Sequence, residues 1–271
     1  MLLAFVPLAG SWVFLRLALA WPTPLFWQTA LISVAFTLFV LSLRAATLGA
    51  AITGGVFTAA IYLATPDVRT ALWPLLALLL LTFTATRFGR RRKEALGLAE
   101  ARHGRTASQV AANLGVAALT GIPEVAMRLF NLAPEDYGRL ALAAMLAAMA
   151  EATADTVSSE LGQVLGGQPR LITTFRRVPP GTDGGITLTG TLLGCLAAAI
   201  VILIGAIVLA LPRTDALIAL AAGIAGLFID SLLGAGPERA GWLNNDAVNT
   251  LSTLAAALLA ATAIAFLIPN P

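Results

Sequence analysis

The feature of this sequence that most constrains its fold is the length of its uncharged apolar stretches. No charged residue occurs between Arg16 and Arg44, and none follows Asp246. A helix needs about 20 apolar residues to cross the hydrocarbon core of a membrane, and these stretches are long enough. Only 11% of the 271 residues are charged, whereas a soluble domain carries about 25%. The sequence therefore predicts a protein that crosses a membrane several times.

The apolar stretches are unbroken and consist mainly of Leu, Ala, Ile and Val, as in residues 71–81. A transmembrane barrel would instead show alternating segments of about ten residues. We therefore predict an all-α, polytopic integral membrane helical bundle of about nine transmembrane helices, forming one domain over residues 1–271. The expected helices cover residues 2–20, 25–43, 46–64, 70–86, 107–123, 139–159, 188–211, 214–232 and 246–268.

Three connections are longer and more polar than the others, at residues 87–106, 162–187 and 234–245. With alternating topology all three emerge on one side, which also carries most of the Lys and Arg residues. Positively charged loops stay in the cytoplasm, so we expect a cytoplasmic N-terminus in a multi-pass protein of the inner cell membrane. Residues 1–86 would form the N-terminal helices, and residues 87–251 a catalytic core that bears the motifs.

Several classes of function are disfavoured by composition. Cys195 is the only cysteine and His103 the only histidine, which argues against disulfides, thiolate clusters and His-rich zinc sites. The net charge of +3 is expected to act as an orientation signal, not as a nucleic-acid patch. We therefore expect no nucleic-acid partner, and the sequence leaves the oligomeric state open.

Acidic residues gather at the end of the sixth expected helix. Glu151, Asp155 and Ser159 follow one another at intervals of four and share a helical face, and Glu160 lies on the next turn. Pairing with arginines of adjacent loops would explain them, but carboxylates are costly in hydrocarbon and are functional candidates by default. Their oxygens are ligands that suit Mg²⁺, which usually binds one or two carboxylates together with substrate phosphates.

The next loop combines glycines with arginines. Glycine lets backbone amides approach an anion closely, and arginine makes charge-assisted hydrogen bonds to phosphate. The loop lacks the Gly-Lys-Ser/Thr of a Walker A motif and is not a dinucleotide fingerprint. A Gly/Pro turn with topology-setting arginines explains the loop alone equally well. The residues in question are Arg170, Arg176, Arg177, Gly181, Gly184 and Gly185.

A third polar group joins the eighth and ninth expected helices. Asp230 ends an otherwise apolar segment, and Asn245, Asp246 and Asn249 lie at the start of the last helix. An N-cap role explains either Asn245 or Asp246, but it explains neither Asp230 nor Asn249.

Weaker polar signals lie at the start of the fifth expected helix. Arg105, Gln109 and Asn113 recur every four residues, so they can face the same polar site. Asn113 is equally well explained as a helix–helix contact.

Together these motifs resemble those of an integral membrane family that includes the animal transmembrane protein nineteen and plant phytyl-phosphate kinase. The resemblance extends from about Leu41 to Leu251. The matching residues are Arg87–Glu94, Arg105 with Gln109, Val110 and Asn113, Ala154–Thr156 with Ser159–Gly162, Pro169–Thr174, Gly181 and Thr182 with Gly184, Gly185 and Thr189–Thr191, Asp230–Ala235, and Asn245 and Asp246 with Val248 and Asn249. Val157 departs from the family pattern, which often has an aromatic residue there.

The resemblance implies a polyprenyl-phosphate kinase that moves a phosphoryl group from CTP to an isoprenoid monophosphate such as phytyl phosphate. It is expected to depend on Mg²⁺ and to act at the cytoplasmic face, with nucleotide, isoprenoid lipid phosphate and membrane lipids as partners. The metal ligands and catalytic residues would be Asp155, Glu160, Asp230 and Asp246. The triphosphate would be held by Arg170, Arg176, Arg177, Gly181, Thr182, Gly184 and Gly185, and substrate or water oriented by Gln109, Asn113, Ser159, Asn245 and Asn249.

Two other functions remain open at this stage. A cytidylyltransferase would use the same substrates but release pyrophosphate and form a CDP-lipid. A lipid or ion transporter would also carry intramembrane carboxylates, but near the midplane and often within inverted repeats. The acids of this sequence cluster at expected cytoplasmic helix ends instead, and no repeat is visible.

Overall fold

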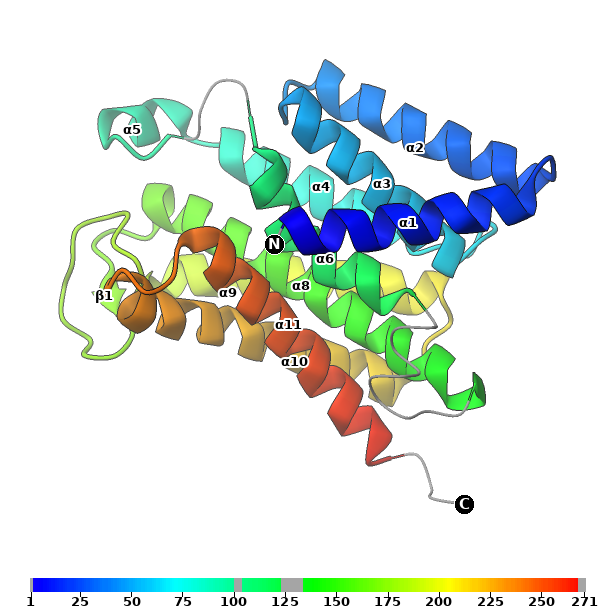
Figure 1. Cartoon of the computed structure of the whole chain (residues 1–271). Coiled ribbons are helices and arrows are strands. Elements are labelled where there is room, and N and C mark those ends of the chain that lie inside the picture. The colour runs from blue at the N-terminus through cyan, green and yellow to red at the C-terminus, as the bar shows by residue number, and fades with distance from the viewer. Residues whose placement is uncertain (1, 100–103, 123–133, 268–271) are drawn as a thin grey trace.

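The protein is almost entirely helical in a computed structural model that describes residues 2–99, 104–122 and 134–267 (Figure 1). Each of the nine helix ranges expected from the sequence overlaps one helix. The helices are α1 (Leu2–Ala20), α2 (Pro24–Ser42), α3 (Leu48–Ala64), α4 (Leu72–Arg87), α5 (Arg90–Ala95), α6 (Ala107–Thr120), α8 (Pro134–Leu165), α9 (Leu188–Val208), α10 (Arg213–Leu233), the π-helical turn η1 (Gly234–Glu238) and α11 (Asn245–Ala265).

The long helix α8 forms the centre of the bundle. It packs against α4, α6, α9, α10 and α11, and its residues from Leu140 to Ala154 are almost completely buried. Alanine dominates this stretch, so neighbouring backbones approach closely, as is typical of helix packing in membranes. Gly194 of α9 and Gly223 of α10 face the α8 backbone at positions where a larger residue would collide.

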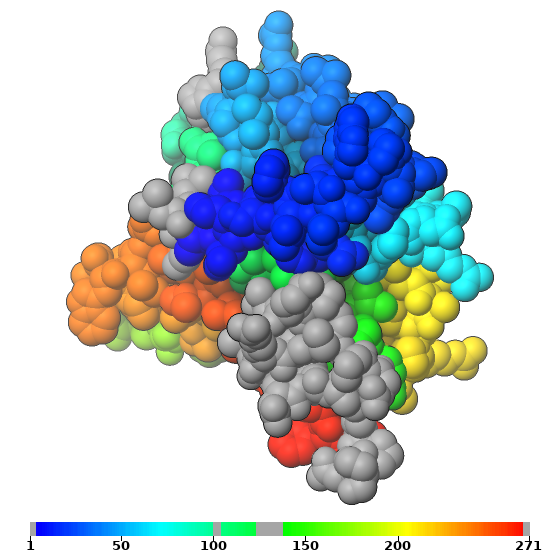
Figure 2. Space-filling model, turned by 45° about the vertical axis from the view of Figure 1, so that its right-hand side comes forward, coloured from blue at the N-terminus to red at the C-terminus, as the bar shows by residue number. Residues whose placement is uncertain are grey.

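The remaining helices form two groups around α8. On one side α1, α3, α4 and α6 share an apolar core with it, and α2 packs mainly against α3. On the other side α9, α10 and α11 share a second core with α8. In the space-filling view of Figure 2 the N-terminal helices, in blue, cover the upper part of the visible face.

The outer helix faces are apolar, as expected for contact with lipid. Exposed large side chains include Phe14 of α1, Leu31 of α2 and Ile207 of α9. Among the residues that the structure describes, five helices are long and apolar enough to cross a membrane, and shorter apolar helices cover Ala4–Ala20, Leu48–Ala64 and Leu72–Arg87. The structure is that of a multi-pass membrane protein. The number of crossings, their orientation and the single-domain organisation stay predictions.

The described parts of the three polar connections meet at one end of the bundle. The connection after α4 contains α5, the one after α8 contains the short antiparallel hairpin β1 (Arg170–Leu171) with β2 (Gly185–Ile186), and the one after α10 contains η1. The α5, β1 and orange α10–α11 segments lie at the left in Figure 1, whereas the connections before α4 and α10 lie at the other end. This shared end carries the predicted site residues.

Candidate functional site

A polar cavity of about 210 Å³ lies where α8, the β1–β2 hairpin, α10 and η1 meet. We call it the acidic cavity, because Asp155, Asp183, Asp230 and Glu238 all line it. Residues of α8, of α10 and of the loop that contains Gly181, Gly184 and Gly185, which we call the glycine loop, thus line one space.

Two carboxylates from different helices are neighbours in this cavity. The carboxyl groups of Asp155 in α8 and Asp230 in α10 lie within hydrogen-bond reach of each other. Each also receives a hydroxyl hydrogen bond: Ser159 Oγ donates to Asp155 over 3.4 Å, and Ser252 Oγ donates to Asp230 over 3.2 Å. The pair is therefore suited to hold a cation.

Glu151 lies one turn before Asp155 and extends the acidic group into the bundle. Its side chain is only 1% exposed, and Oε1 is buried without a hydrogen-bond partner. Both Asp155 and Asp230 act on it electrostatically. Gly226 of α10 makes room for it, because a Cβ at that position would press against the Glu151 side chain. A buried acceptor without a partner is costly, and such groups concentrate at functional sites.

The glycine loop closes the acidic cavity by packing tightly against its neighbours. Gly181 and Gly184 have left-handed φ angles of 82° and 71°, which favour glycine. A Cβ at Gly181 would collide with Leu98 in the connection after α4, and a Cβ at Gly184 would collide with the backbone of Ala235 in η1. The glycines therefore join the three polar connections into one wall.

A second cavity of about 280 Å³ adjoins the first. We call it the amide cavity, because five side-chain amides line it: Gln109, Asn113, Gln163, Asn245 and Asn249. Asp155, Ser159, Gln163 and Asn245 line both cavities. All five residues expected to orient substrate, the four amides Gln109, Asn113, Asn245 and Asn249 together with Ser159, thus face one space.

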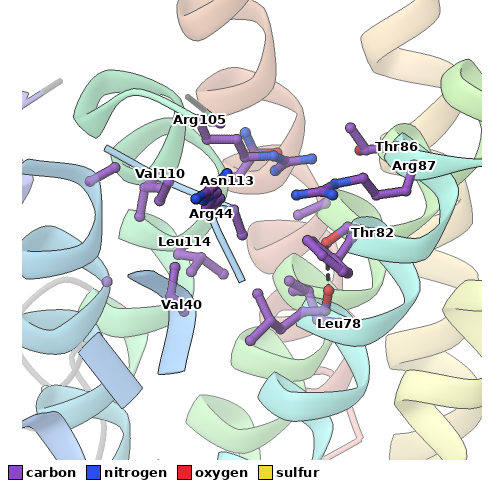
Figure 3. Close-up of a pocket in the computed structure, with 18 of the residues that line it drawn as sticks. Val40, Arg44, Leu78, Thr82, Thr86, Arg87, Arg105, Val110, Asn113 and Leu114 are labelled. Atoms are coloured by element: carbon purple, nitrogen blue, oxygen red, sulfur yellow. Dashed lines mark hydrogen bonds between the residues drawn. The ribbon is translucent and has the colours of Figure 1, made fainter. Parts of the chain in front are cut away.

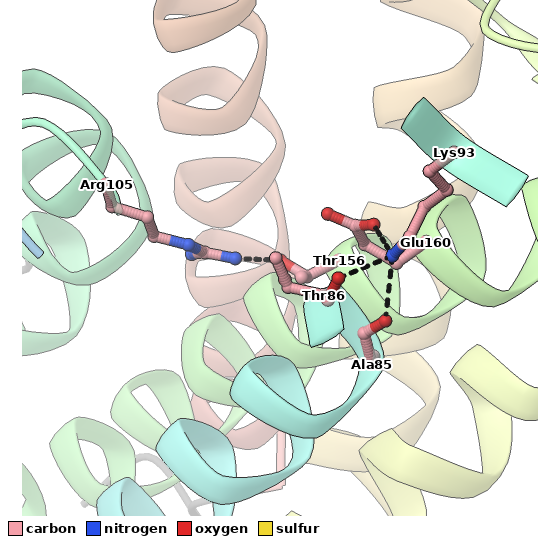
Figure 4. Close-up of polar contacts among 6 residues, drawn as sticks. All are labelled: Ala85, Thr86, Lys93, Arg105, Thr156 and Glu160. Atoms are coloured by element: carbon pink, nitrogen blue, oxygen red, sulfur yellow. Dashed lines mark hydrogen bonds and ion pairs between the residues drawn. The ribbon is translucent and has the colours of Figure 1, made fainter. Parts of the chain in front are cut away.

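Arg105 supplies positive charge to the amide cavity. Its guanidinium donates a hydrogen bond from Nη2 to Thr156 Oγ1 over 3.2 Å and acts electrostatically on Asp155 (Figure 4). Its backbone N–H donates to the Ala45 carbonyl and its carbonyl accepts from the Thr47 N–H, just before α3, and Thr106 caps α6 with a full capping box. These contacts fix the position of the Arg105 backbone beside the amide cavity.

Glu160 has a different environment from the one expected for a metal ligand. Its Oε2 accepts a hydrogen bond from Lys93 Nζ over 2.6 Å, and the same ammonium donates to the carbonyls of Ala85 and Thr86 (Figure 4). Lys93 is 1% exposed. The Glu160 carboxylate therefore lines the amide cavity as one half of an ion pair that joins α5 to α8.

Other residues named from the sequence lie outside both cavities. Asp246 and the three loop arginines are not among the residues that line either space. Arg170 donates to the carbonyl of Phe175 within the hairpin over 2.9 Å. The cap of α11 is Asn244, whose side chain accepts from the Ala247 amide, so the N-cap interpretation of Asn245 or Asp246 is wrong. The loop arginines are Arg170, Arg176 and Arg177.

The described residues offer at most a pair of carboxylates to a metal ion. Over residues 2–99, 104–122 and 134–267, no group of three or more Asp, Glu, His or Cys side chains is arranged to hold one. The four carboxylates named from the sequence therefore do not form a common ligand set. Asp155 and Asp230 remain as a pair, and one or two carboxylates completed by substrate phosphates suffice for Mg²⁺.

Several residues that line the site were not selected from the sequence. Asp183, Glu238 and Gln163 line the acidic cavity, and Ser252 supports Asp230 from α11. Glu151 shares a helical face with Asp155 in the sequence, but the predicted metal ligands do not include it. The others carry no distinctive pattern, because their roles depend on how loops and helices meet.

The chain belongs to the family described as integral membrane protein DUF92, whose model matches residues 31–257. This membership confirms the resemblance and the polytopic helical class found from the sequence. No solved structure matches the chain.

Curated relatives come from archaea, plants and cyanobacteria. The chain is 45% identical over 119 residues to uncharacterized membrane protein MJ0933 of Methanocaldococcus jannaschii, covering 44% of this chain and 50% of that protein. It is 32% identical over 190 residues to protein VTE6, chloroplastic, of Arabidopsis thaliana, covering 69% and 56%. It is 30% identical over 176 residues to uncharacterized membrane protein sll0875 of Synechocystis, covering 65% and 66%. The matches thus span about half to two thirds of each relative.

Proposed function

We propose that this protein is an isoprenoid-phosphate kinase that transfers a phosphoryl group from CTP to an isoprenoid monophosphate, with Mg²⁺, at the cytoplasmic face of the inner cell membrane. The observation that carries the proposal is the position of Asp155, which lines both the acidic and the amide cavity. Two phosphate groups held in these spaces would meet beside it. Family membership and the resemblance to phytyl-phosphate kinase support the substrate class.

The acidic cavity is the donor side in this proposal. Its wall includes Gly181, Thr182, Gly184 and Gly185, and glycine-rich backbone allows close approach to phosphates. The loop arginines Arg170, Arg176 and Arg177 lie on the same connection but outside the cavity lining, and in this proposal they would contact the outer part of the nucleotide. The carboxylates repel a triphosphate unless a cation accompanies it.

The amide cavity is the acceptor side. Side-chain amides donate hydrogen bonds to phosphate oxygens, and Arg105 adds a positive charge. The acceptor monophosphate is already an anion, so no general base is needed. An acceptor oxygen attacks the γ-phosphorus, the bond from that phosphorus to the β–γ bridging oxygen breaks, and CDP leaves with the bridging oxygen and its electron pair. The lipid product is a diphosphate.

The residues present contribute mainly by positioning the two anions in line. In-line phosphoryl transfer depends on alignment and charge stabilisation more than on covalent chemistry by the protein. Asp155 and Asp230 would hold Mg²⁺, which supplies charge neutralisation between the phosphates. Ser159 and Ser252 keep the two carboxylates oriented through their hydrogen bonds.

Product analysis tests the proposal against the alternatives. Purified protein in nanodiscs receives geranylgeranyl phosphate, Mg²⁺ and CTP labelled in its γ-phosphate. Kinase activity gives labelled lipid diphosphate and unlabelled CDP. Labelled pyrophosphate with a CDP-lipid would instead identify a cytidylyltransferase. Absence of any nucleotide turnover, with every lipid and nucleotide recovered unchanged, would contradict the enzyme proposal and favour a transporter.

A further inference from the structure

An apolar pocket of about 80 Å³ lies between the N-terminal helices and α4, outside the two polar cavities. Val40 and Phe36 of α2, Leu78 and Thr82 of α4, and Leu114 of α6 line its deeper part. The pocket lies at the junction between α2, which packs mainly on α3, and α4, which packs mainly on α8 and α9. Exposed apolar side chains on α2 and α4, such as Leu38 and Leu80, would face the hydrocarbon of a bilayer.

One end of this pocket is strongly basic. Its lining includes Arg44, Arg87, Arg90 and Arg105, and none of the described residues that line it is acidic. Figure 3 shows Arg87 and Arg105 near one end, with Leu78 at the other. A pocket with apolar walls and a cationic mouth matches a molecule with an anionic head and a hydrocarbon chain.

At the basic end, Arg87 is held in position by two contacts, and the Thr86 hydroxyl has no hydrogen-bond partner. Arg87 donates from Nη2 to the Leu43 carbonyl over 2.9 Å and stacks on the Phe83 ring at 4.8 Å. Beside it, Thr86 Oγ1 is buried without a hydrogen-bond partner and lines the pocket. A buried hydroxyl without a partner is costly, and a phosphate oxygen next to Arg87 would satisfy it.

The apolar pocket leads towards the proposed site of transfer. Arg105 and Asn113 line both this pocket and the amide cavity, and the amide cavity shares Asp155 with the acidic cavity. The three spaces therefore form a series from hydrocarbon to amides to carboxylates. A lipid anion with its chain in the first space would present its head to the second.

We propose that this pocket is the binding site for a single-chain lipid monophosphate, with the chain between α2, α4 and α6. The phosphate would be held at the basic end by Arg44, Arg87, Thr86 and Arg105, the last of which also lines the amide cavity. Sites that enclose a drug-sized ligand measure about 300–1,000 Å³, so a pocket of about 80 Å³ holds only the chain segment beside the head. The rest of the chain stays in the bilayer. The assignment of this lipid as the acceptor rests on the proposed kinase function, whereas its binding does not.

A binding experiment without nucleotide tests the site. Full-length protein in nanodiscs of neutral lipid is titrated with geranylgeranyl phosphate, with geranylgeraniol and with inorganic phosphate, and bound ligand is measured by native mass spectrometry. The lipid monophosphate should bind at one copy per chain and much more tightly than either part alone. Equal binding of the alcohol, or of inorganic phosphate, would overturn the proposal.

Variants that remove positive charge test where the lipid phosphate binds. Charge-assisted hydrogen bonds contribute enough that losing one weakens binding by about tenfold or more, so Arg44→Gln with Arg87→Gln should weaken geranylgeranyl phosphate at least tenfold. Arg91→Gln is the matched control, because Arg91 lies on α5, is exposed and does not line the pocket. Unchanged binding in the double variant, or an equal loss in the control, would overturn the proposal.

Variants that fill the apolar pocket test where the hydrocarbon chain of the lipid binds. Thr82→Phe places a ring in the pocket, whereas Thr84→Phe changes the exposed face of the same helix. Only Thr82→Phe should weaken binding of the lipid monophosphate. Specific binding without any phosphoryl transfer would refute the kinase and leave the pocket assignment intact. Normal transfer with an unchanged KM for lipid in both pocket variants would refute the pocket and leave the kinase intact.

Discussion

Lys93 Nζ and Glu160 Oε2 lie 2.6 Å apart and join the short helix α5 to the central helix α8. The lysine side chain is 1% exposed and the glutamate 18%. Breaking a buried ion pair by removing one partner leaves a charge without compensation, at a cost of about 3–5 kcal/mol when burial is complete. Because Glu160 is partly exposed, we expect Lys93→Met to lower the free energy of unfolding by about 1–3 kcal/mol.

A double-mutant cycle checks this prediction. Lys93→Met, Glu160→Gln and the combined variant are compared by thermal unfolding in detergent. The combined variant should be more stable than the sum of the two single losses predicts. Strictly additive losses would contradict the pair, and a Glu160→Gln variant of normal stability but without activity would make Glu160 a ligand of the reaction centre instead.

Gly184→Ala should damage the site more than Gly167→Ala. Both glycines have a φ of 71°, so the backbone strain of the substitution is the same. A Cβ at Gly167 meets open space, whereas a Cβ at Gly184 collides with the backbone of Ala235. We expect Gly184→Ala to raise the KM for nucleotide at least tenfold. Equal KM values in the two variants would contradict a structural role for this contact.

Glu151→Gln should lower activity without lowering thermal stability. Glu151 is buried, Oε1 has no hydrogen-bond partner, and Asp155 and Asp230 repel its carboxylate. The amide of Gln can donate a hydrogen bond towards these acids, so we expect unchanged or higher thermal stability. If the acidic group serves the reaction, kcat falls about tenfold or more, in line with the stability–activity trade-off at functional sites. Lower stability with normal kcat would mean that Glu151 is only structural.

The opposite end of the bundle offers a change that should affect stability alone. Arg139 donates from Nε and Nη2 to both carboxylate oxygens of Asp215, at 2.9 and 2.8 Å, and Asp215 is fully buried. Arg139→Met should lower the unfolding free energy by about 3 kcal/mol, because it leaves a buried carboxylate unpaired. The KM values of the folded fraction should stay normal, and a changed KM would mean that the two ends are coupled.

Local sequence patterns predicted most of the helices and part of the site. The spacing of Gln109 and Asn113, and of Asp155 and Ser159, placed each pair on one helical face, and the structure brings all four to the amide cavity. Helix periodicity suffices here because both members of a pair lie on the same helix.

Features that depend on contacts between distant segments could not be predicted. Lys93 and Glu160 are 67 residues apart in sequence, so their pairing follows from how α5 folds back on α8. The α8 helix also extends to Leu165, whereas the sequence predicts its end at residue 159. Polar residues such as Gln163 ended the expected apolar span, but they continue the helix and line the cavities. The inward position of Glu238 depends on the turn η1, which no local pattern indicated.

The central claim is that Asp155 stands between a donor and an acceptor phosphate, and its most direct test is the rate of phosphoryl transfer in Asp155→Asn and Asp246→Asn. Removing one group of a preorganised electrostatic site costs about 100- to 1,000-fold in kcat, and Asp155 would contribute to such a site by holding Mg²⁺. We expect Asp155→Asn to fold normally and to lower kcat for phosphoryl transfer from CTP to geranylgeranyl phosphate at least 100-fold. Asp246 lines neither cavity, so we expect kcat of Asp246→Asn to stay within a few-fold of that of the unmodified protein. Equal rates in the two variants would contradict the account.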